Sequence, residues 1–446
     1  MCSLLLVPAL AQEPPRPSVA LTLEEASRLA VAQNPAVRAA LARVEQAREE
    51  VDVVAAPARP QLTFSGSLVQ MRQPAGPPVR ANFQGLPVTT EFQSEPVDYA
   101  QGQLDLLLRQ LLFDFGRIQA HIDRARASGD SVAQALATSS QQIALQAQLA
   151  YLDALEARAR EQVQAEAVEL AETQLAASEA RFAAGTAPRA DTVYARVPVS
   201  RAVLERTRSR LEVSNTQASL NRVLGLPQDT PLVLQDPEKP PEVPGDLAAS
   251  VAAARKLRPE VLGRQFELEA SQHALQAALR DNNPGVYASA DMNSVAYNEN
   301  AFLPGSAGWR FGLEFRWPIL EGNRKAHLVT QAEARVRESE ALLEDQLAAV
   351  ELEVRQAYAA VETATEAYTA AGVEVDQARL AMEMAQGQYR AGVAPLLQVT
   401  ESQQSFLRAR TDRLATYYGY LRARARLTHA RGELLPAQQA DETLAH

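Results

Sequence analysis

Histidine and cysteine are the side chains that most often catalyse reactions or bind metals, and here they are few and isolated. Cys2 is the single cysteine, which excludes an internal disulfide or a cysteine-rich metal site. The five histidines stand singly, and the motifs HExxH, GxGxxG, GxSxG and the phosphate-binding Walker loop do not occur. We therefore expect no enzymatic activity, no metal site and no cofactor.

A second kind of chemistry, contact with lipid, is indicated by the stretch from Gly308 to Arg324. Large apolar side chains alternate there with charged residues and glycine, and the apolar set is Trp309, Phe311, Leu313, Phe315 and Trp317. Strict alternation predicts a strand with two different faces. From the first tryptophan to the second the strand would span about 26 Å. Tilted by about 40°, it would cover roughly 20 Å, close to the ~25 Å apolar band of an outer-membrane barrel. The alternative is a strand packed on a soluble core.

The composition limits how this chain could meet a membrane. It has 446 residues and a formal net charge of -10, and no run approaches eighteen consecutive apolar residues, so we expect no transmembrane helix. Any crossing would have to be a closed barrel. The negative charge argues against nucleic acid as a partner.

The first twenty residues are interpreted as the remnant of a secretory signal followed by a proline-rich lead. The apolar run and the ALA-Q sequence resemble a signal peptide and its cleavage site, although the basic start is missing. A start codon assigned too far downstream would explain this, and a lipid on Cys2 is left open.

The chain repeats itself. Asn34 to Val37 matches Arg258 to Val261, and Arg181 to Pro188 matches Gln388 to Pro395. We divide the chain into the lead (1–20), repeat 1 (21–225), a proline-rich linker (226–246), repeat 2 (247–435) and a C-terminal tail (436–446).

Each repeat predicts the same elements in the same order. A helix (Leu23 to Ala56, Leu247 to Asp281) precedes two strands joined by a loop, which runs from Met71 to Asp98 in repeat 1. A long helix follows, Arg117 to Ala184 or Arg324 to Ala391, with a length of about 100 Å. After a Gly-x-x-Pro turn a return helix runs back. The fold class is therefore mainly α, with four strands per chain.

The long helix of repeat 2 carries a heptad pattern. One apolar seam is Leu347, Val354, Val361, Tyr368, Val375, Met382 and Tyr389, and a second, richer in alanine, begins at Leu343. Such a pattern predicts a left-handed coiled coil. Because the apolar stripe is narrow, the helix suits a thin wall wetted on both sides.

Four strands cannot close a barrel, and an open edge in lipid leaves backbone groups unsatisfied. Strands in a membrane would thus require several copies, giving eight, twelve or sixteen strands from two, three or four chains. Strand counting leaves this choice open.

The order and double occurrence of these segments resemble the TolC family of outer-membrane efflux channels. The segments that carry the resemblance begin at Leu21, Arg59, Leu112, Arg181, Leu220, Leu313 and Gln388. The resemblance implies a homotrimer in the Gram-negative outer membrane: a 12-stranded β-barrel above a 12-helix α-barrel that extends into the periplasm. It also implies a periplasmic adaptor (membrane fusion) protein and an inner-membrane transporter of RND, ABC or MFS type as partners.

The resemblance further implies the functional residues. Asp191, Tyr389, Gln398 and Glu401 stand at the pore aperture; Gln398 replaces a family carboxylate, and Ala394 stands where the family has a linking arginine. The expected adaptor-contact tips are Gly185, Thr186, Ala187, Gly392, Val393 and Ala394. The expected membrane girdle is Trp309, Phe311, Phe315 and Trp317, facing outer-membrane lipid.

Each assignment has a purely structural alternative. Tyr389 also continues the heptad, Asp191 could be the N-cap of the return helix, and the turns could serve only to reverse the chain. For function, the chain is interpreted as the exit duct of a tripartite efflux pump or a type I secretion system. The alternative is a soluble periplasmic coiled-coil scaffold or adaptor, and the cargo is left open.

Overall fold

The computed structural model describes residues 19–76, 79–82, 89–92, 95–237, 246–298 and 305–434. The expected signal remnant with Cys2, part of the proline-rich linker and the C-terminal tail lie outside the described residues.

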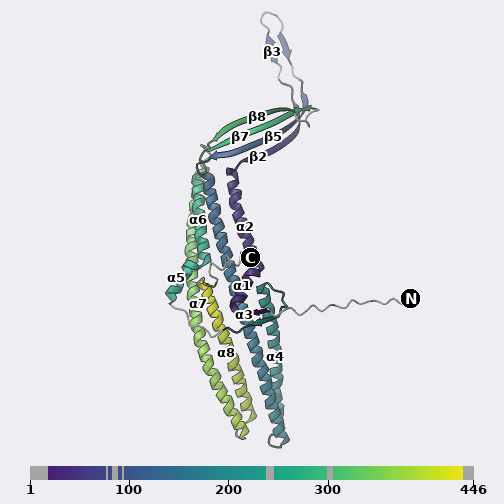
Figure 1. The fold of residues 1–446 in the computed structure, drawn as a ribbon, viewed down its shortest axis with the longest axis vertical. Coiled ribbons are helices and arrows are strands. Elements are labelled where there is room, and N and C mark those ends of the chain that lie inside the picture. Colours follow the sequence, from purple (N-terminus) through teal and green to yellow (C-terminus); the bar gives the residue numbers. More distant parts are fainter. Residues whose placement is uncertain are drawn as a thin grey trace, which may run out of the picture. The chain divides into compact units, whose positions relative to one another are not determined.

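Helices dominate, and they occur twice in the same order with nearly equal lengths (Figure 1). The bounds are α1 Leu23–Gln33, α2 Pro35–Ala55, α3 Arg117–Ala183 and α4 Arg189–Leu224, then α5 Leu247–Leu257, α6 Pro259–Leu279, α7 Arg324–Arg390 and α8 Leu396–Ala430. A short 3-10 helix, Ala56–Ala58, follows α2. The two long helices α3 and α7 have 67 residues each, which confirms the predicted pair. In the described residues no helix combines the length and apolarity needed to cross a membrane.

The first helix of each repeat was expected to be continuous, and this expectation is wrong. The chain leaves the helical conformation at Asn34 (φ -66°, ψ 129°) and again at Arg258 (φ -69°, ψ 120°). Each of these residues precedes a proline, whose ring disfavours the helical conformation in the residue before it. Pro35 and Pro259 then begin the next helix, where a proline is tolerated because no intrahelical N–H bond is lost.

The strands within the described residues form three separate sheets. Their bounds are β1 Val19–Leu21, β2 Gln61–Gln73, β3 Val79–Asn82, β4 Thr89–Phe92, β5 Val97–Phe113, β6 Leu232–Leu234, β7 Gly285–Tyr297 and β8 Ser306–Arg316. The largest sheet is antiparallel with the order β2-β5-β7-β8, while β1 pairs with β6 and β3 pairs with β4. The four strands of the large sheet are those predicted. The β3–β4 hairpin lies where a loop was expected, and β8 ends one residue before Trp317.

By their internal contacts the residues fall into two compact units. Unit 1 comprises Met1–Val44, Ser131–Gln265 and Leu342–His446, and unit 2 comprises Glu45–Asp130 and Phe266–Ala341. Each unit draws on both sequence repeats. Each repeat contributes helices to both units and strands of the large sheet to unit 2.

Unit 1 is built from helical hairpins whose seams follow the heptads. Val350, Val354 and Val361 of α7 are buried, which confirms both predicted seams at these positions. Ion pairs also connect neighbouring helices. Arg206 of α4 pairs with Glu161 of α3, with 3.3 Å between Nε and Oε1.

A buried tyrosine fixes the short β1–β6 ribbon to the helices of unit 1. The hydroxyl of Tyr151 in α3 lies 2.7 Å from the carbonyl oxygen of Leu21 and accepts a hydrogen bond of 2.9 Å from the amide of Gln235. Tyr151 is fully buried, and burial is the main reason that the pKa of its phenol is raised. A neutral hydroxyl can thus both donate to Leu21 at the end of β1 and accept from Gln235, the residue after β6.

Candidate functional sites: the apolar sheet face and the helical turns

The register of unit 2 gathers apolar side chains from all four strands on one face of the large sheet. Opposite positions share a face, and the pairs Phe64↔Leu106, Leu106↔Met292 and Met292↔Trp309 run across the sheet. We call this surface the apolar face. Its residues are Leu62, Phe64, Leu68, Leu104, Leu106, Leu108, Val286, Ala288, Ala290, Met292, Trp309, Phe311, Leu313 and Phe315.

The apolar face is open. Trp309 is 84% exposed, and Phe64, Phe311 and Leu313 are 69%, 71% and 71% exposed. The helices of the chain do not cover these side chains in the part of the chain that is described. The alternative of a strand packed on its own soluble core is therefore wrong.

The opposite face of the sheet is polar, as the alternation predicts. Arg109 lies 3.5 Å from Glu314, measured from Nη2 to Oε2, and its guanidinium stacks over the ring of Tyr287 at 4.2 Å. Arg316 pairs with the same carboxylate at 2.7 Å. This polar surface can face water, whereas exposing the apolar face to water would cost free energy.

Two sharp turns end the long helices of unit 1. Gly185 (φ 73°) and Gly392 (φ 77°) adopt the left-handed conformation, which glycine reaches without strain. The amide of Thr186 donates to the carbonyl of Arg181 and the amide of Val393 donates to that of Gln388, at 2.9 and 3.0 Å. These bonds are typical of the Schellman motif. Gly185, Thr186, Gly392 and Val393 are exposed, and Ala187 and Ala394 are half-buried.

Beside the turns, three side chains from three helices form what we call the turn-end cluster: Arg181, Asp191 and Tyr389. The guanidinium of Arg181 lies over the Tyr389 ring, 4.6 Å from Cζ to the ring centroid. Its Nη1 and Nη2 donate to the carbonyls of Tyr389 at 3.1 Å and Arg390 at 3.3 Å. The Tyr389 hydroxyl donates to Oδ2 of Asp191 at 3.4 Å. The cluster thus ties α3 and α4 to the end of α7.

The structure distinguishes between the two roles considered for Asp191 and for Tyr389. Asp191 is not the N-cap of α4, because Pro188 holds that position and Asp191 lies in the first turn. Tyr389 is 8% exposed and packs against Ala195, Leu396 and Val399, so it is a core residue that also makes a polar link.

The other expected aperture residues lie on α8 outside the cluster. Gln398 is exposed and donates from Nε2 to Oε1 of Gln388 at 3.4 Å. Glu401 is also exposed. The structure therefore brings together Asp191 and Tyr389 but not the remaining two.

The sequence does not indicate Arg181 as a functional residue. The family resemblance implies a linking arginine in the second turn, where this chain has Ala394. The guanidinium comes instead from the last turn of α3, in the other hairpin. One signal was available: Arg181 and Gln388 are matched positions of the two repeats, and only the first is basic.

Comparisons with known proteins agree with this architecture. The model of the outer membrane efflux protein family matches residues 26–226 and 251–433. Protein CyaE of Bordetella pertussis is 28% identical, with 93% of this chain and 84% of CyaE covered. Outer membrane protein OprJ of Pseudomonas aeruginosa is 25% identical over 84% of this chain and 77% of OprJ.

Solved structures show the same fold at lower identity. The CmeC outer membrane channel of Campylobacter jejuni superposes with a TM-score of 0.77 at 16% identity, covering 95% of this chain and 88% of that one. The helical hairpins, the exposed apolar sheet face and the family match over both repeats agree: the chain belongs to the outer membrane efflux protein family and is a channel protein of the outer membrane that extends into the periplasm.

Proposed function

We propose that this chain assembles as a homotrimer into a duct through which a transport system releases its cargo across the outer membrane. The observation that carries the proposal is the large sheet. Its apolar face is exposed, and its edge strands β2 and β8 each pair with one neighbour among the described strands.

The open edges explain why several copies are needed. Unpaired backbone groups in lipid cost several kcal/mol each, so the strands must continue from one chain into the next. Three chains of four strands give a 12-stranded β-barrel, the number implied by the family resemblance. The helices would then form a 12-helix α-barrel.

The role of a duct requires partners at the helical turns. Gly185 to Ala187 and Gly392 to Ala394 present mostly exposed backbone and small side chains, which suit contact with the tip of a periplasmic adaptor. An inner-membrane transporter would supply the energy, in an efflux pump or in a type I secretion system. The duct itself would catalyse no reaction and need no cofactor.

The aperture would lie beside the same turns. The turn-end cluster links the two hairpins of one chain, and breaking those links would let the hairpins separate. Asp191 and Glu401 would contribute negative charge to the aperture, and rings of carboxylates favour cations.

Fractionation, followed by cross-linking and conductance measurements, tests the proposal. We expect the protein in the outer-membrane fraction, a cross-linked species of three chains after detergent extraction, and ion conductance in planar bilayers. A monomer recovered from the soluble periplasm would refute the proposal and would favour the alternative of a soluble periplasmic scaffold or adaptor.

A further inference from the structure

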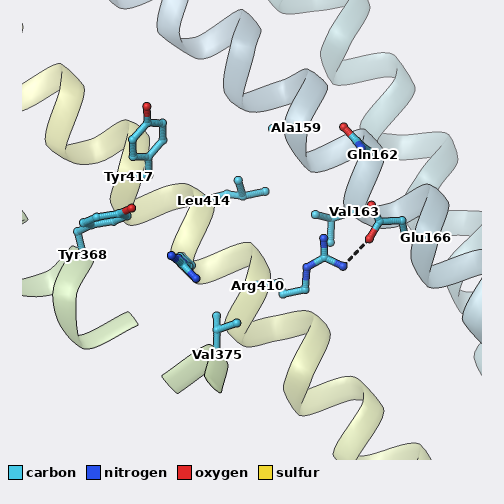
Figure 2. A pocket seen from close by; sticks show the side chains of 10 residues that line it. Ala159, Gln162, Val163, Glu166, Tyr368, Val375, Arg410, Leu414 and Tyr417 are labelled. Carbon is cyan, nitrogen blue, oxygen red and sulfur yellow. Dashed lines mark hydrogen bonds and ion pairs between the residues drawn. The ribbon is translucent and has the colours of Figure 1, made fainter. Parts of the chain in front are cut away.

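A cavity of about 390 Å³ lies within unit 1, between α3, α7 and α8 (Figure 2). It shares no lining residue with the turn-end cluster or with the apolar face. Its volume falls in the range of about 300–1,000 Å³ that small-molecule sites occupy.

One part of the cavity wall is apolar. Val163 of α3 and Val375 of α7 are buried, and Leu414 of α8 is half-buried. Figure 2 shows Leu414 and Val163 between the two tyrosines and the glutamate at the other end of the site. These side chains would stabilise an apolar ligand by removing its surface from water.

A second part of the wall is aromatic. Tyr368 and Tyr417 lie with ring centroids 5.7 Å apart and planes inclined by 46°. Neither phenolic hydroxyl has a hydrogen-bond partner among the described residues. Burial raises the pKa of the Tyr417 phenol, which keeps this group a neutral donor. Two tilted rings favour a flat partner, which can stack or meet a ring edge.

The charge of the cavity is positive by one unit. Arg410 forms an ion pair with Glu166 across α8 and α3, so those two charges cancel. Arg413 lies 6.0 Å over the Tyr368 ring, and in the described parts of the chain no carboxylate is paired with it. Its guanidinium is therefore available to a ligand.

We propose that this cavity is a binding site for a small flat aromatic molecule that bears one carboxylate. The ring of such a ligand would contact Tyr368, Tyr417 and Leu414, and its carboxylate would pair with Arg413. An uncharged ligand would gain the apolar contacts alone. This inference does not depend on the chain acting as a duct.

Equilibrium dialysis with 2-naphthoate tests the site, using the full-length protein in lipid nanodiscs and empty nanodiscs as the reference. The uncharged 2-naphthamide is the matched ligand. We expect saturable binding of 2-naphthoate, tighter than that of the amide by about tenfold, which is about 1.4 kcal/mol, because only the carboxylate can form a charge-assisted hydrogen bond with the Arg413 guanidinium.

The variants separate the parts of the site. Arg413→Gln should bring the affinity for 2-naphthoate to that for the amide, and Tyr368→Leu should weaken both ligands. Arg408→Gln is the control, because Arg408 is exposed on the same helix and does not line the cavity.

Three results would overturn the proposal: no saturable binding of 2-naphthoate, equal binding by the wild type and Arg413→Gln, or an equal loss in Arg408→Gln. If Tyr368→Leu fails to assemble, Arg413→Gln still tests the site, because Arg413 is exposed and its substitution should not disturb folding.

Discussion

At the scale of single residues, one guanidinium joins the two helical hairpins where their turns lie. The Arg181 guanidinium lies over the Tyr389 ring and donates to the Tyr389 carbonyl oxygen. The Tyr389 hydroxyl in turn donates to the Asp191 carboxylate. This interaction joins the α3–α4 hairpin to the α7–α8 hairpin, so we expect it to hold the two hairpins together. A neighbouring pair, Arg196 with Glu179 at 3.2 Å, joins α4 to α3 within one hairpin.

This contrast gives a prediction for Arg181→Gln. The substitution removes a cation–π contact and charge-assisted hydrogen bonds, together worth about 1–3 kcal/mol, and it should raise the mean conductance of the duct in planar bilayers. Arg196→Gln is the matched control and should leave the conductance near the wild-type value. Equal conductance in all three proteins would contradict the role of the cluster.

The two carboxylates proposed to line the aperture, Asp191 and Glu401, give a second prediction. Asp191→Asn combined with Glu401→Gln should lower the preference for cations, because it removes two negative charges per chain. The reversal potential in a potassium chloride gradient measures this preference. A reversal potential identical to that of the wild type would rule out the proposed role.

At the scale of elements, the break between α5 and α6 is held by a buried arginine. Arg258 is 4% exposed, and its guanidinium donates to Glu260 at 3.0 Å, to Glu353 of α7 at 2.8 Å and to the carbonyl of Ala430 in α8 at 3.3 Å. His429 also lies by Glu353, 3.7 Å from Nδ1 to Oε1.

Arg258→Ala should therefore destabilise unit 1. Breaking a buried pair costs about 3–5 kcal/mol, and the cost here should fall below that because Glu353 is half-exposed. Thermal loss of helical circular dichroism measures the effect. Arg255→Ala, which removes an exposed pair with Glu351, should shift the midpoint far less, and equal shifts would count against the account.

The carboxyl group of Glu353 determines how the stability contributed by Arg258 depends on pH. Hydrogen bonding from His429 and the charge of Arg258 lower the pKa of Glu353 below its ordinary value of 4.5. A lowered carboxyl pKa adds stability above the unfolded value, and that stability is lost as the pH falls through the folded value. The difference in stability between the wild type and Arg258→Ala should shrink in acid.

The apolar face supplies the prediction for the sheet. Phe315→Asp should reduce the yield of assembled protein in membranes, because charge on a lipid-facing strand costs up to about 2–4 kcal/mol for Arg or Lys and less for Asp. Ser289→Asp, on the polar face, is the control and should assemble normally. An unchanged yield for Phe315→Asp, measured by cross-linking in isolated outer membranes, would contradict contact with lipid.

Much of the fold could be predicted because its signals are local and periodic. The long helices follow from stretches without proline, and the strand faces follow from alternation. The helix breaks at Asn34 and Arg258 were missed although the following prolines predict them. Arg181 could not be assigned, because its contact with Tyr389 joins segments about two hundred residues apart, and no local pattern reports such a contact.

At the scale of the whole molecule, the proposed duct requires that lipid covers the apolar face. The chain has two tryptophans, and Trp309 is the one within β8. In water the exposed apolar face would be unfavourable, and in lipid the unpaired edges of a four-stranded sheet would be unfavourable, so the proposed assembly has to satisfy both.

Fluorescence quenching by brominated lipids reports whether acyl chains contact Trp309. In a Trp317→Phe variant, Trp309 is the only tryptophan, and reconstitution into bilayers with brominated acyl chains should quench its emission strongly while aqueous iodide has little effect. A matched protein without native tryptophans, carrying Thr63→Trp on the polar face, should show the reverse. Emission of Trp309 that iodide quenches and brominated lipid does not would contradict the account.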